Sequence, residues 1–268
     1  MIALSVIFRK YYIYTVVSGD TLYSIAQRYA SSAGEIMRVN HLFPPVTDPG
    51  LIFPGDVLLV PDLAITGKVH YVVHSGDTVG NISYRYSTYS DLVAGINHLA
   101  RPELIYPLQQ LVLPAFIYEV KMGDSLHSIA RQYGLPLASI MRANERRPGF
   151  QADLIWQGYH LLLPIPTMRN MVVWTPLPGS KIRSGIRIQG QARAFEANVL
   201  FQLRDANGVT VSRERFTTAD AGAPTYGNFT AIVPFDRSPT AGIGELWVYT
   251  RSAKDGSIQD LVRTKVYF

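Results

Sequence analysis

The sequence contains no cysteine. This absence excludes a disulfide scaffold, a thiolate zinc site and a cysteine nucleophile. Long apolar runs are also missing, since no stretch approaches the roughly 18–20 residues that a membrane-spanning helix requires. Met1 to Phe8 is apolar, but Arg9 and Lys10 follow it, whereas a secretory signal carries its positive charges first. We therefore expect no membrane span and read no clear signal peptide.

The net charge of +5 is distributed unevenly. Residues 1–167 hold 12 Lys+Arg and 12 Asp+Glu, whereas residues 168–268 hold 13 and 8. A basic surface on the second part could attract an anionic polymer through general electrostatics. A solvated β-sheet surface explains the same excess more simply. No basic run with interleaved aromatic residues indicates nucleic-acid recognition, so we expect no nucleic-acid partner.

The sequence does contain one unit repeated three times, which indicates a repeat architecture. The copies read YTVVSGDTLYSIA from Tyr14, YVVHSGDTVGNIS from Tyr71 and YEVKMGDSLHSIA from Tyr118. An asparagine follows the aspartate of each copy by 20 residues, and each unit closes with an apolar segment and a proline. These residues are Asn40, Asn97 and Asn144, and Pro61, Pro114 and Pro164.

Each unit is predicted to have the order β-α-α-β. The Asp of Gly-Asp-Thr/Ser, or the hydroxyl residue after it, would cap the first helix. Leu22, Ile25, Ala26 and Tyr29 recur at spacings of three and four, as an apolar helix face requires. The second helix is expected to end near Asn40, a residue that tolerates a left-handed C-terminal cap.

The pattern Gly-Asp-Thr/Ser-Leu-x-x-Ile-Ala, then Asn, then Pro-Gly-x-x-Leu-x-x-Pro resembles the lysin-motif (LysM) family over about residues 12–164. The resemblance implies β-α-α-β units at 12–62, 70–115 and 117–165. It also implies binding of N-acetylglucosamine-containing glycan, either peptidoglycan or chitin. No cofactor and no metal are expected.

In that family the groove lies between the turn after the first strand and the loop before the last strand. The resemblance carries glycan binding onto the following positions: Gly19, Asp20, Thr21, Leu22, Gly50, Leu51 and Ile52; Gly76, Asp77, Thr78, Val79, Glu103, Leu104 and Ile105; and Gly123, Asp124, Ser125, Leu126, Asp153, Leu154 and Ile155. An N-acetyl group requires amide-like hydrogen bonds and a small apolar pocket, which loop backbone and Leu or Ile can supply. The three aspartates are more simply explained as helix caps, and the three asparagines as loop braces or caps.

The second unit departs from this pattern. Gly80 and Gly95 fall inside its predicted helices, where each costs about 1 kcal/mol relative to Ala. Leu108 stands where the other units have Gly55 and Gly158. Its groove is therefore expected to be altered or idle.

After Pro166 the apolar period changes from helical to alternating. About seven strands and hairpin-type turns such as Asp205–Gly208 predict a β-sandwich over residues 170–268. The segments Pro176–Ser180 and Gly190–Ala197 resemble the immunoglobulin-like domain attached to bacterial spore-germination proteins. The expected fold class is thus multidomain α+β, with three β-α-α-β units followed by an all-β immunoglobulin-like sandwich.

We expect a non-enzymatic protein that anchors to cell-wall glycan, in the wall or the spore envelope of a bacterium. A wall-cleaving glycosidase would need paired carboxylates, and Glu196, Glu214 and Glu245 lie in no motif that would pair them. The six histidines lack metal-ligand spacing. The alternative is a scaffold or targeting subunit for a wall hydrolase, in which residues 170–268 hold a protein partner.

Overall fold

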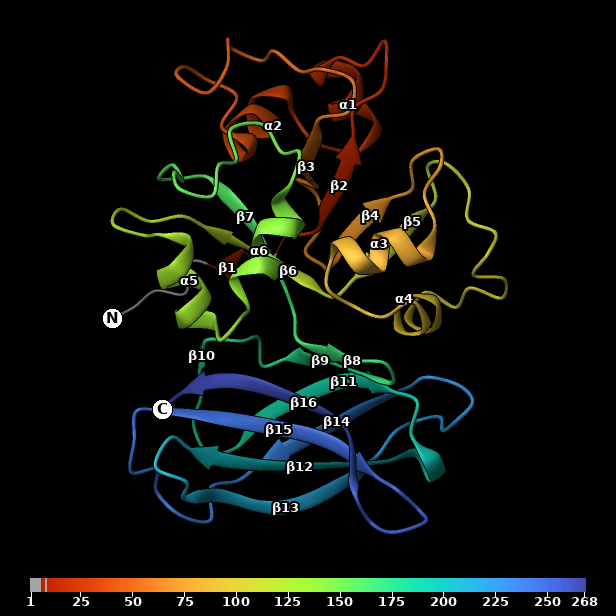
Figure 1. Ribbon diagram of the computed structural model, residues 1–268, viewed down its shortest axis with the longest axis vertical. Coiled ribbons are helices and arrows are strands. Elements are labelled where there is room, and N and C mark those ends of the chain that lie inside the picture. Colours follow the sequence, from red (N-terminus) through yellow and green to blue (C-terminus); the bar gives the residue numbers. More distant parts are fainter. Residues whose placement is uncertain (1–5, 8) are drawn as a thin grey trace. The chain divides into compact units, whose positions relative to one another are not determined.

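The computed structural model describes residues 6–7 and 9–268, which cluster into two compact units (Figure 1). The first unit comprises the chain up to Ser87, Ala100–Arg131 and Leu135–Pro164. The second comprises Thr88–Leu99, Gln132–Gly134 and Ile165–Phe268.

The apolar start of the chain, for which the sequence predicts no export signal, lies mostly outside the described residues. Within residues 6–7 and 9–268, no helix has the length and apolar character needed to cross a membrane.

All three repeats show the predicted order of elements. The first contains β2 (Tyr11–Thr15), α1 (Leu22–Arg28), α2 (Ala33–Asn40) and β3 (Val57–Pro61). The second contains β4 (Val69–Val72), α3 (Val79–Arg85), α4 (Ser90–Ile96) and β5 (Gln110–Leu113). The third contains β6 (Ala115–Glu119), α5 (Leu126–Tyr133), α6 (Leu137–Asn144) and β7 (His160–Pro164).

The helices form where the sequence pattern places them. The predicted apolar face of α1 is buried, with Ile25 fully inaccessible and Leu22, Ala26 and Tyr29 nearly so. Helix α2 ends at Asn40, but His41, and not the asparagine, adopts the left-handed conformation of the cap (φ 55°).

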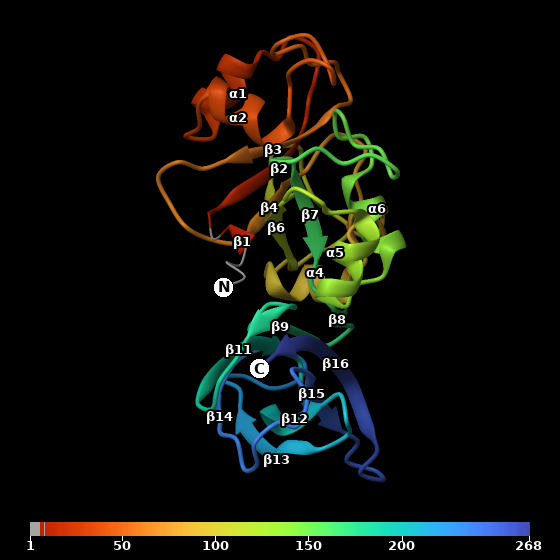
Figure 2. The ribbon, with the colours of Figure 1, turned by 90° about the vertical axis from the view of Figure 1, so that its left-hand side faces the viewer.

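Strands of the first two repeats join into one sheet with the order β3-β2-β4-β5 (Figure 1; Figure 2 shows β3, β2 and β4 from another side). Its centre is the parallel pair β2 and β4, in which Ile13 lies opposite Tyr71. The third repeat forms a separate sheet with the order β1-β6-β7, where β1 (Val6–Ile7) pairs antiparallel with β6. The first two repeats are therefore joined by backbone hydrogen bonds.

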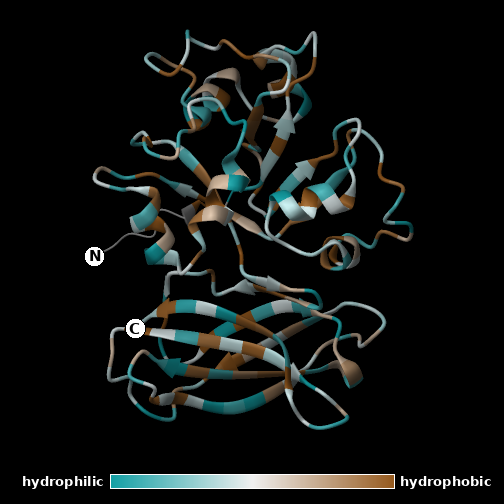
Figure 3. Cartoon of the chain, viewed as in Figure 1, coloured by the Kyte–Doolittle hydropathy of each residue, from teal (hydrophilic) through white to brown (hydrophobic). Residues whose placement is uncertain are grey.

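The second unit contains the predicted sandwich. One sheet has the order β10-β16-β15-β12-β13 and the other β14-β11-β9-β8. The long strands are β9 (Met171–Thr175), β11 (Ile186–Ala192), β12 (Asn198–Asp205), β13 (Thr210–Thr218), β14 (Gly227–Val233), β15 (Ile243–Arg251) and β16 (Ile258–Tyr267). The short ones are β8 (Thr167–Met168) and β10 (Ser180–Lys181). Apolar and polar residues alternate along these strands, and the inward side chains form one core (Figure 3).

Helix α4 also belongs to the second unit. A Cβ atom at Gly95 would lie only 2.1 Å from ring carbons of Tyr226, so the glycine leaves room for this aromatic ring. At the other end of α4, Asp91 lies 3.0 Å from the guanidinium of Arg169 and 3.4 Å from that of Arg193. Gly95, which is unfavourable for a helix by itself, is thus explained by packing.

In the first unit, Asn40 and Asn144 each brace a helix end against the last strand of their repeat. Asn40 donates its amide hydrogens to the carbonyls of Ile36 and Leu59 and accepts from the backbone N–H of Leu59. Asn144 makes the same three hydrogen bonds with Ile140 and Leu162. The predicted bracing role is confirmed for Asn40 and Asn144, whereas Asn97 donates its amide to the Val93 carbonyl at 2.8 Å.

Arg147 connects the two braces. Its side chain is buried and donates to Oδ1 of Asn144 at 2.8 Å, to Oδ1 of Asn40 at 3.2 Å and to the carbonyl of His160. The guanidinium also lies 4.8 Å from the ring centroid of Tyr159. Two sequence-distant repeats are thus joined through one buried cation.

His160 is fully buried beside this arginine. Its Nδ1 lies 3.0 Å from the carbonyl of Gly158, and its Nε2 has no hydrogen-bond partner among the described residues. Burial lowers the pKa of His160 to about 4, and the positive charges of Arg38 and Arg147 add to that effect.

We expect the free energy of unfolding to decrease as the pH falls from 6.5 to about 4. In this window the imidazole binds a proton readily only in the unfolded chain, so protons favour unfolding. The shift corresponds to about 3 kcal/mol. Urea unfolding at several pH values should show a shallower dependence for His160→Phe than for the natural chain. Equal slopes in the two proteins would contradict this assignment.

Candidate functional site

The turn after the first strand is organised by its aspartate. Oδ2 of Asp20 accepts from the Tyr14 hydroxyl at 2.6 Å and from the Val17 N–H at 2.9 Å. Asp77 and Asp124 make the same pair of hydrogen bonds in their repeats. Burial, and then the Asp20 carboxylate, raise the pKa of Tyr14 to about 12. The carboxylates are therefore engaged in holding the turn.

The helix cap is the hydroxyl residue that follows. Thr21 accepts from the backbone N–H of Ser24 at 3.0 Å, and Thr78 from that of Asn81 at 3.1 Å. Ser125 accepts in the same way from Ser128 at 3.1 Å. The interpretation of Asp20, Asp77 and Asp124 as helix caps is therefore wrong. The hydroxyl residue makes the cap, and the aspartate instead ties the turn to the preceding strand.

The first repeat brings its two predicted groove segments together. A Cβ atom at Gly50 would lie 3.4 Å from Cδ1 of Leu22, which places the loop before β3 beside the start of α1. Ile52 packs against the same core as Leu22. Gly19, with a φ of 87° and no heavy atom near its Cβ position, leaves the opposite turn open.

The same gradient of exposure recurs in all three repeats. The first helical residue is buried (Leu22, Val79 and Leu126), and the isoleucine is half-buried (Ile52, Ile105 and Ile155). The leucine that precedes this isoleucine in the sequence is exposed by 41% at Leu51, 42% at Leu104 and 45% at Leu154. Gly76, Thr78, Glu103, Gly123, Ser125 and Asp153 are exposed as well. At the predicted groove positions, each repeat thus has one buried, one half-buried and one exposed apolar residue.

The sequence analysis did not identify one residue beside the predicted groove of the first repeat, Met37. Sδ of Met37 lies 3.6 Å from the Cβ position of Gly50, so this thioether packs beside the predicted groove segment Gly50–Ile52. Counting three residues back from the brace asparagine gives Met37, Ala94 and Met141 in the three repeats. That fixed offset could have identified the position, and it shows that the second repeat lacks the methionine.

The second repeat keeps its turn without glycine. Leu108 adopts a φ of 69° and donates its N–H to the Val73 carbonyl at 2.8 Å. Gly55 and Gly158 make the equivalent hydrogen bonds to Val16 and Val120. A non-glycine residue in this left-handed region costs about 1 kcal/mol or more.

The carboxylates considered for catalysis have separate environments. Glu214 accepts from the Tyr249 hydroxyl and from Arg251, and Glu245 accepts from the Trp247 ring N–H at 2.9 Å. Glu196 is exposed and adopts a φ of 51° in a short 3-10 turn. In the described part of the chain, no group of three His, Asp or Glu side chains could hold a metal ion.

Comparison with known families gives two matches. The LysM domain matches residues 14–61, 71–114 and 118–164. The immunoglobulin-like domain of bacterial spore germination matches residues 170–257. Both resemblances predicted from the sequence are confirmed.

Individual relatives are similar over part of their length. N-acetylmuramoyl-L-alanine amidase sle1 of Staphylococcus saprophyticus is 32% identical over 49% of this chain and 46% of that protein. Autolysin of Enterococcus faecalis is 28% identical over 59% of this chain and 25% of its own length. The solved structure of the Bacillus cereus spore cortex-lytic enzyme SleL is 34% identical, with 39% of this chain and 22% of that one covered and a TM-score of 0.30. This chain therefore spans half or less of the length of these proteins.

We expect Leu108→Gly to stabilise the fold by up to about 1 kcal/mol, because glycine adopts the left-handed region without strain. The gain is limited because glycine also increases the conformational entropy of the unfolded chain. The reciprocal change Gly158→Leu should destabilise by about 1–2 kcal/mol. Thermal unfolding of both variants measures the two effects. A loss of stability in Leu108→Gly would mean that the leucine side chain contributes packing that outweighs its backbone strain.

Proposed function

Because this chain belongs to the LysM family and carries an immunoglobulin-like domain of bacterial spore germination, we propose that it binds N-acetylglucosamine-containing cell-wall glycan without cleaving it. Peptidoglycan is the proposed polymer, and chitin is the alternative. The protein would thereby be anchored to the bacterial cell wall or to the spore cortex and coat.

The observation that carries this proposal is the exposure gradient repeated in the three grooves. Leu51, Leu104 and Leu154 offer apolar contact at almost the same accessibility. An acetamido methyl group can contact such a side chain, and open turn backbone beside it can supply hydrogen bonds to the amide. Three linked sites on one chain would also increase apparent affinity for a polymer through effective concentration.

Two observations support a non-catalytic role. Both matched families are binding-type domains, and they account for most of residues 14–257. Glu214 and Glu245 hydrogen-bond with different neighbouring side chains of the sandwich, which does not favour their acting together as the acid–base pair of a glycosidase.

The alternative is a scaffold or targeting subunit for a wall hydrolase. Phe195 and Phe216 are exposed by 62% and 72% and line one cavity of about 400 Å³ in the second unit. Exposed aromatic residues of this kind are enriched where proteins bind one another. A protein partner of residues 170–268 would contact this surface.

We expect Leu51→Gln and Leu154→Gln each to weaken binding to insoluble peptidoglycan about fivefold, since each removes roughly 1 kcal/mol of apolar contact. The double variant should lose far more than either single one, because polymer binding depends on linked sites. Leu104→Gln should have the smallest effect, because the second repeat has Ala94 in place of the methionine. Depletion of the soluble protein by purified peptidoglycan measures these affinities.

Phe216→Gln, on the second unit, is the matched control and should bind normally. A stronger effect of Phe216→Gln than of the groove variants would contradict the placement of the glycan site. The same samples should release no reducing sugar and no new amine from peptidoglycan. Reproducible release by the purified chain would contradict the non-catalytic proposal.

A further inference from the structure

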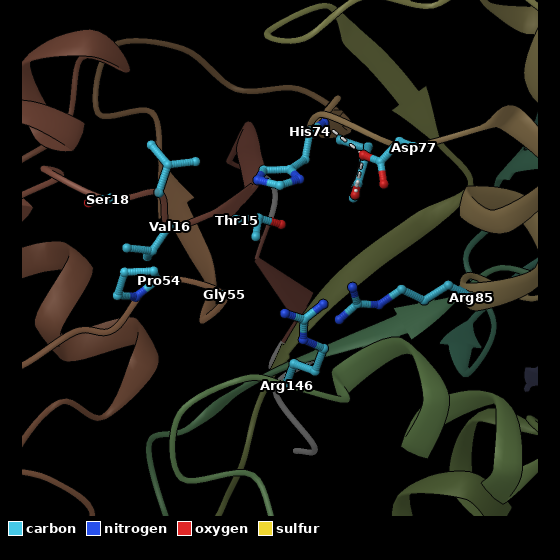
Figure 4. Close-up of a pocket in the computed structure, with 11 residues that line it drawn as sticks. Thr15, Val16, Ser18, Pro54, Gly55, His74, Asp77, Arg85 and Arg146 are labelled. Atoms are coloured by element: carbon cyan, nitrogen blue, oxygen red, sulfur yellow. Dashed lines mark hydrogen bonds between the residues drawn. The ribbon is translucent and has the colours of Figure 1, made fainter.

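A cavity of about 310 Å³ in the first unit is lined by residues from all three repeats (Figure 4). Ser18 and Gly55 come from the first repeat, His74 and Arg85 from the second, and Arg146 from the third. In Figure 4 the side chains of Arg85 and Arg146 converge in this cavity. Two positively charged side chains thus lie close together, although neither arginine belongs to the sequence pattern that the three repeats share.

Arg85 is held in place by neutral groups. It is the last residue of α3, and its Nη2 donates to the backbone carbonyl of Glu145. Its Nε is buried and has no hydrogen-bond partner among the described residues. The guanidinium lies 5.6 Å from the ring centroid of Tyr86. These contacts orient the charge but do not neutralise it.

Arg146 is positioned by its backbone. Its φ is 62°, and its carbonyl accepts from the N–H of Val57 at 3.0 Å. The next residue, Arg147, is anchored in the core. Nη2 of Arg146 lies 2.8 Å from where a Cβ atom of Gly55 would be, so a larger residue at position 55 would displace the guanidinium.

Neither arginine has an acidic partner. Among the residues that the structure describes, no carboxylate oxygen lies within ion-pair distance of Arg85 or Arg146. The one acidic residue lining the cavity is Asp77, whose Oδ2 accepts from the Tyr71 hydroxyl and the His74 N–H. The two guanidinium groups therefore leave a positive cavity with unused donors.

We propose that this cavity binds a carboxylate of the peptide-bearing wall glycan. Paired planar guanidinium forks match the two oxygens of a carboxylate, and the cavity volume lies at the lower limit for ligand pockets, which suits one small group. Ser18 and Pro54 in its wall flank the two segments of the first groove, Gly19–Leu22 and Gly50–Ile52. The proposal rests on glycan binding by that groove, and it favours peptidoglycan over chitin, which carries no carboxylate.

The test compares three soluble ligands on the full chain by calorimetry: muropeptides with free carboxylates, the same muropeptides after amidation, and chitohexaose. Arg146→Gln and Arg85→Gln should each weaken binding of the free muropeptides about tenfold or more, since each removes a charge-assisted hydrogen bond. Binding of chitohexaose should stay within twofold. Amidation should weaken binding to the natural chain by a similar factor and make it insensitive to both variants.

Arg131→Gln, an exposed arginine on α5 outside this cavity, is the control and should leave all affinities unchanged. Arg146→Lys should lose part of the affinity, because it keeps the charge without the fork. Equal losses for chitohexaose and muropeptides, or no loss for either, would overturn the carboxylate site while leaving glycan binding in place. Failure of the natural chain to bind any of the three ligands would instead overturn the proposed function.

Discussion

One buried arginine determines how the first unit is assembled. Arg147 has no carboxylate partner among the described residues. Its two Nη atoms donate to the side-chain oxygens of Asn40 and Asn144 and to the His160 carbonyl, while its buried Nε has no partner among these residues. An ionised group removed from water costs several kcal/mol unless such acceptors surround it. Because each asparagine already braces a helix to a strand, the guanidinium can reach its acceptors only when the first and third repeats are folded and packed together.

This constraint extends to the surface that binding would use. With Arg147 fixed in the core, the preceding residue must project outward, and its positive φ directs Arg146 into the cavity beside Arg85. Strands β2 and β4 join the first two repeats through backbone hydrogen bonds. The loops that carry the predicted groove segments of these repeats therefore belong to one folded unit. This arrangement suits recognition of a polymer at several points along its length.

Local features could be predicted from the sequence, and tertiary ones could not. The spacing of Leu22, Ile25 and Tyr29 predicts a buried helix face because it depends only on helical geometry. The parallel pairing of β2 with β4 has no local signal, since either strand could equally form a sheet edge. Arg147 is one of two adjacent arginines with identical local chemistry, and only packing decides which is buried. Likewise, Gly95 is unfavourable for a helix by its intrinsic propensity, and only the tertiary structure shows that the Tyr226 ring packs against it.

The proposed function requires that the predicted grooves of the LysM repeats bind N-acetylglucosamine polymers. Methyl NMR spectra of the full chain, recorded during titration with chitohexaose, test it most directly because the candidate groove carries distinctive methyl groups. We predict that Leu51, Ile52 and Met37 shift in a saturable manner, while buried methyl groups of the sandwich such as Val248 stay unchanged. Saturable shifts confined to the sandwich, or no shifts at any ligand concentration, would contradict the account.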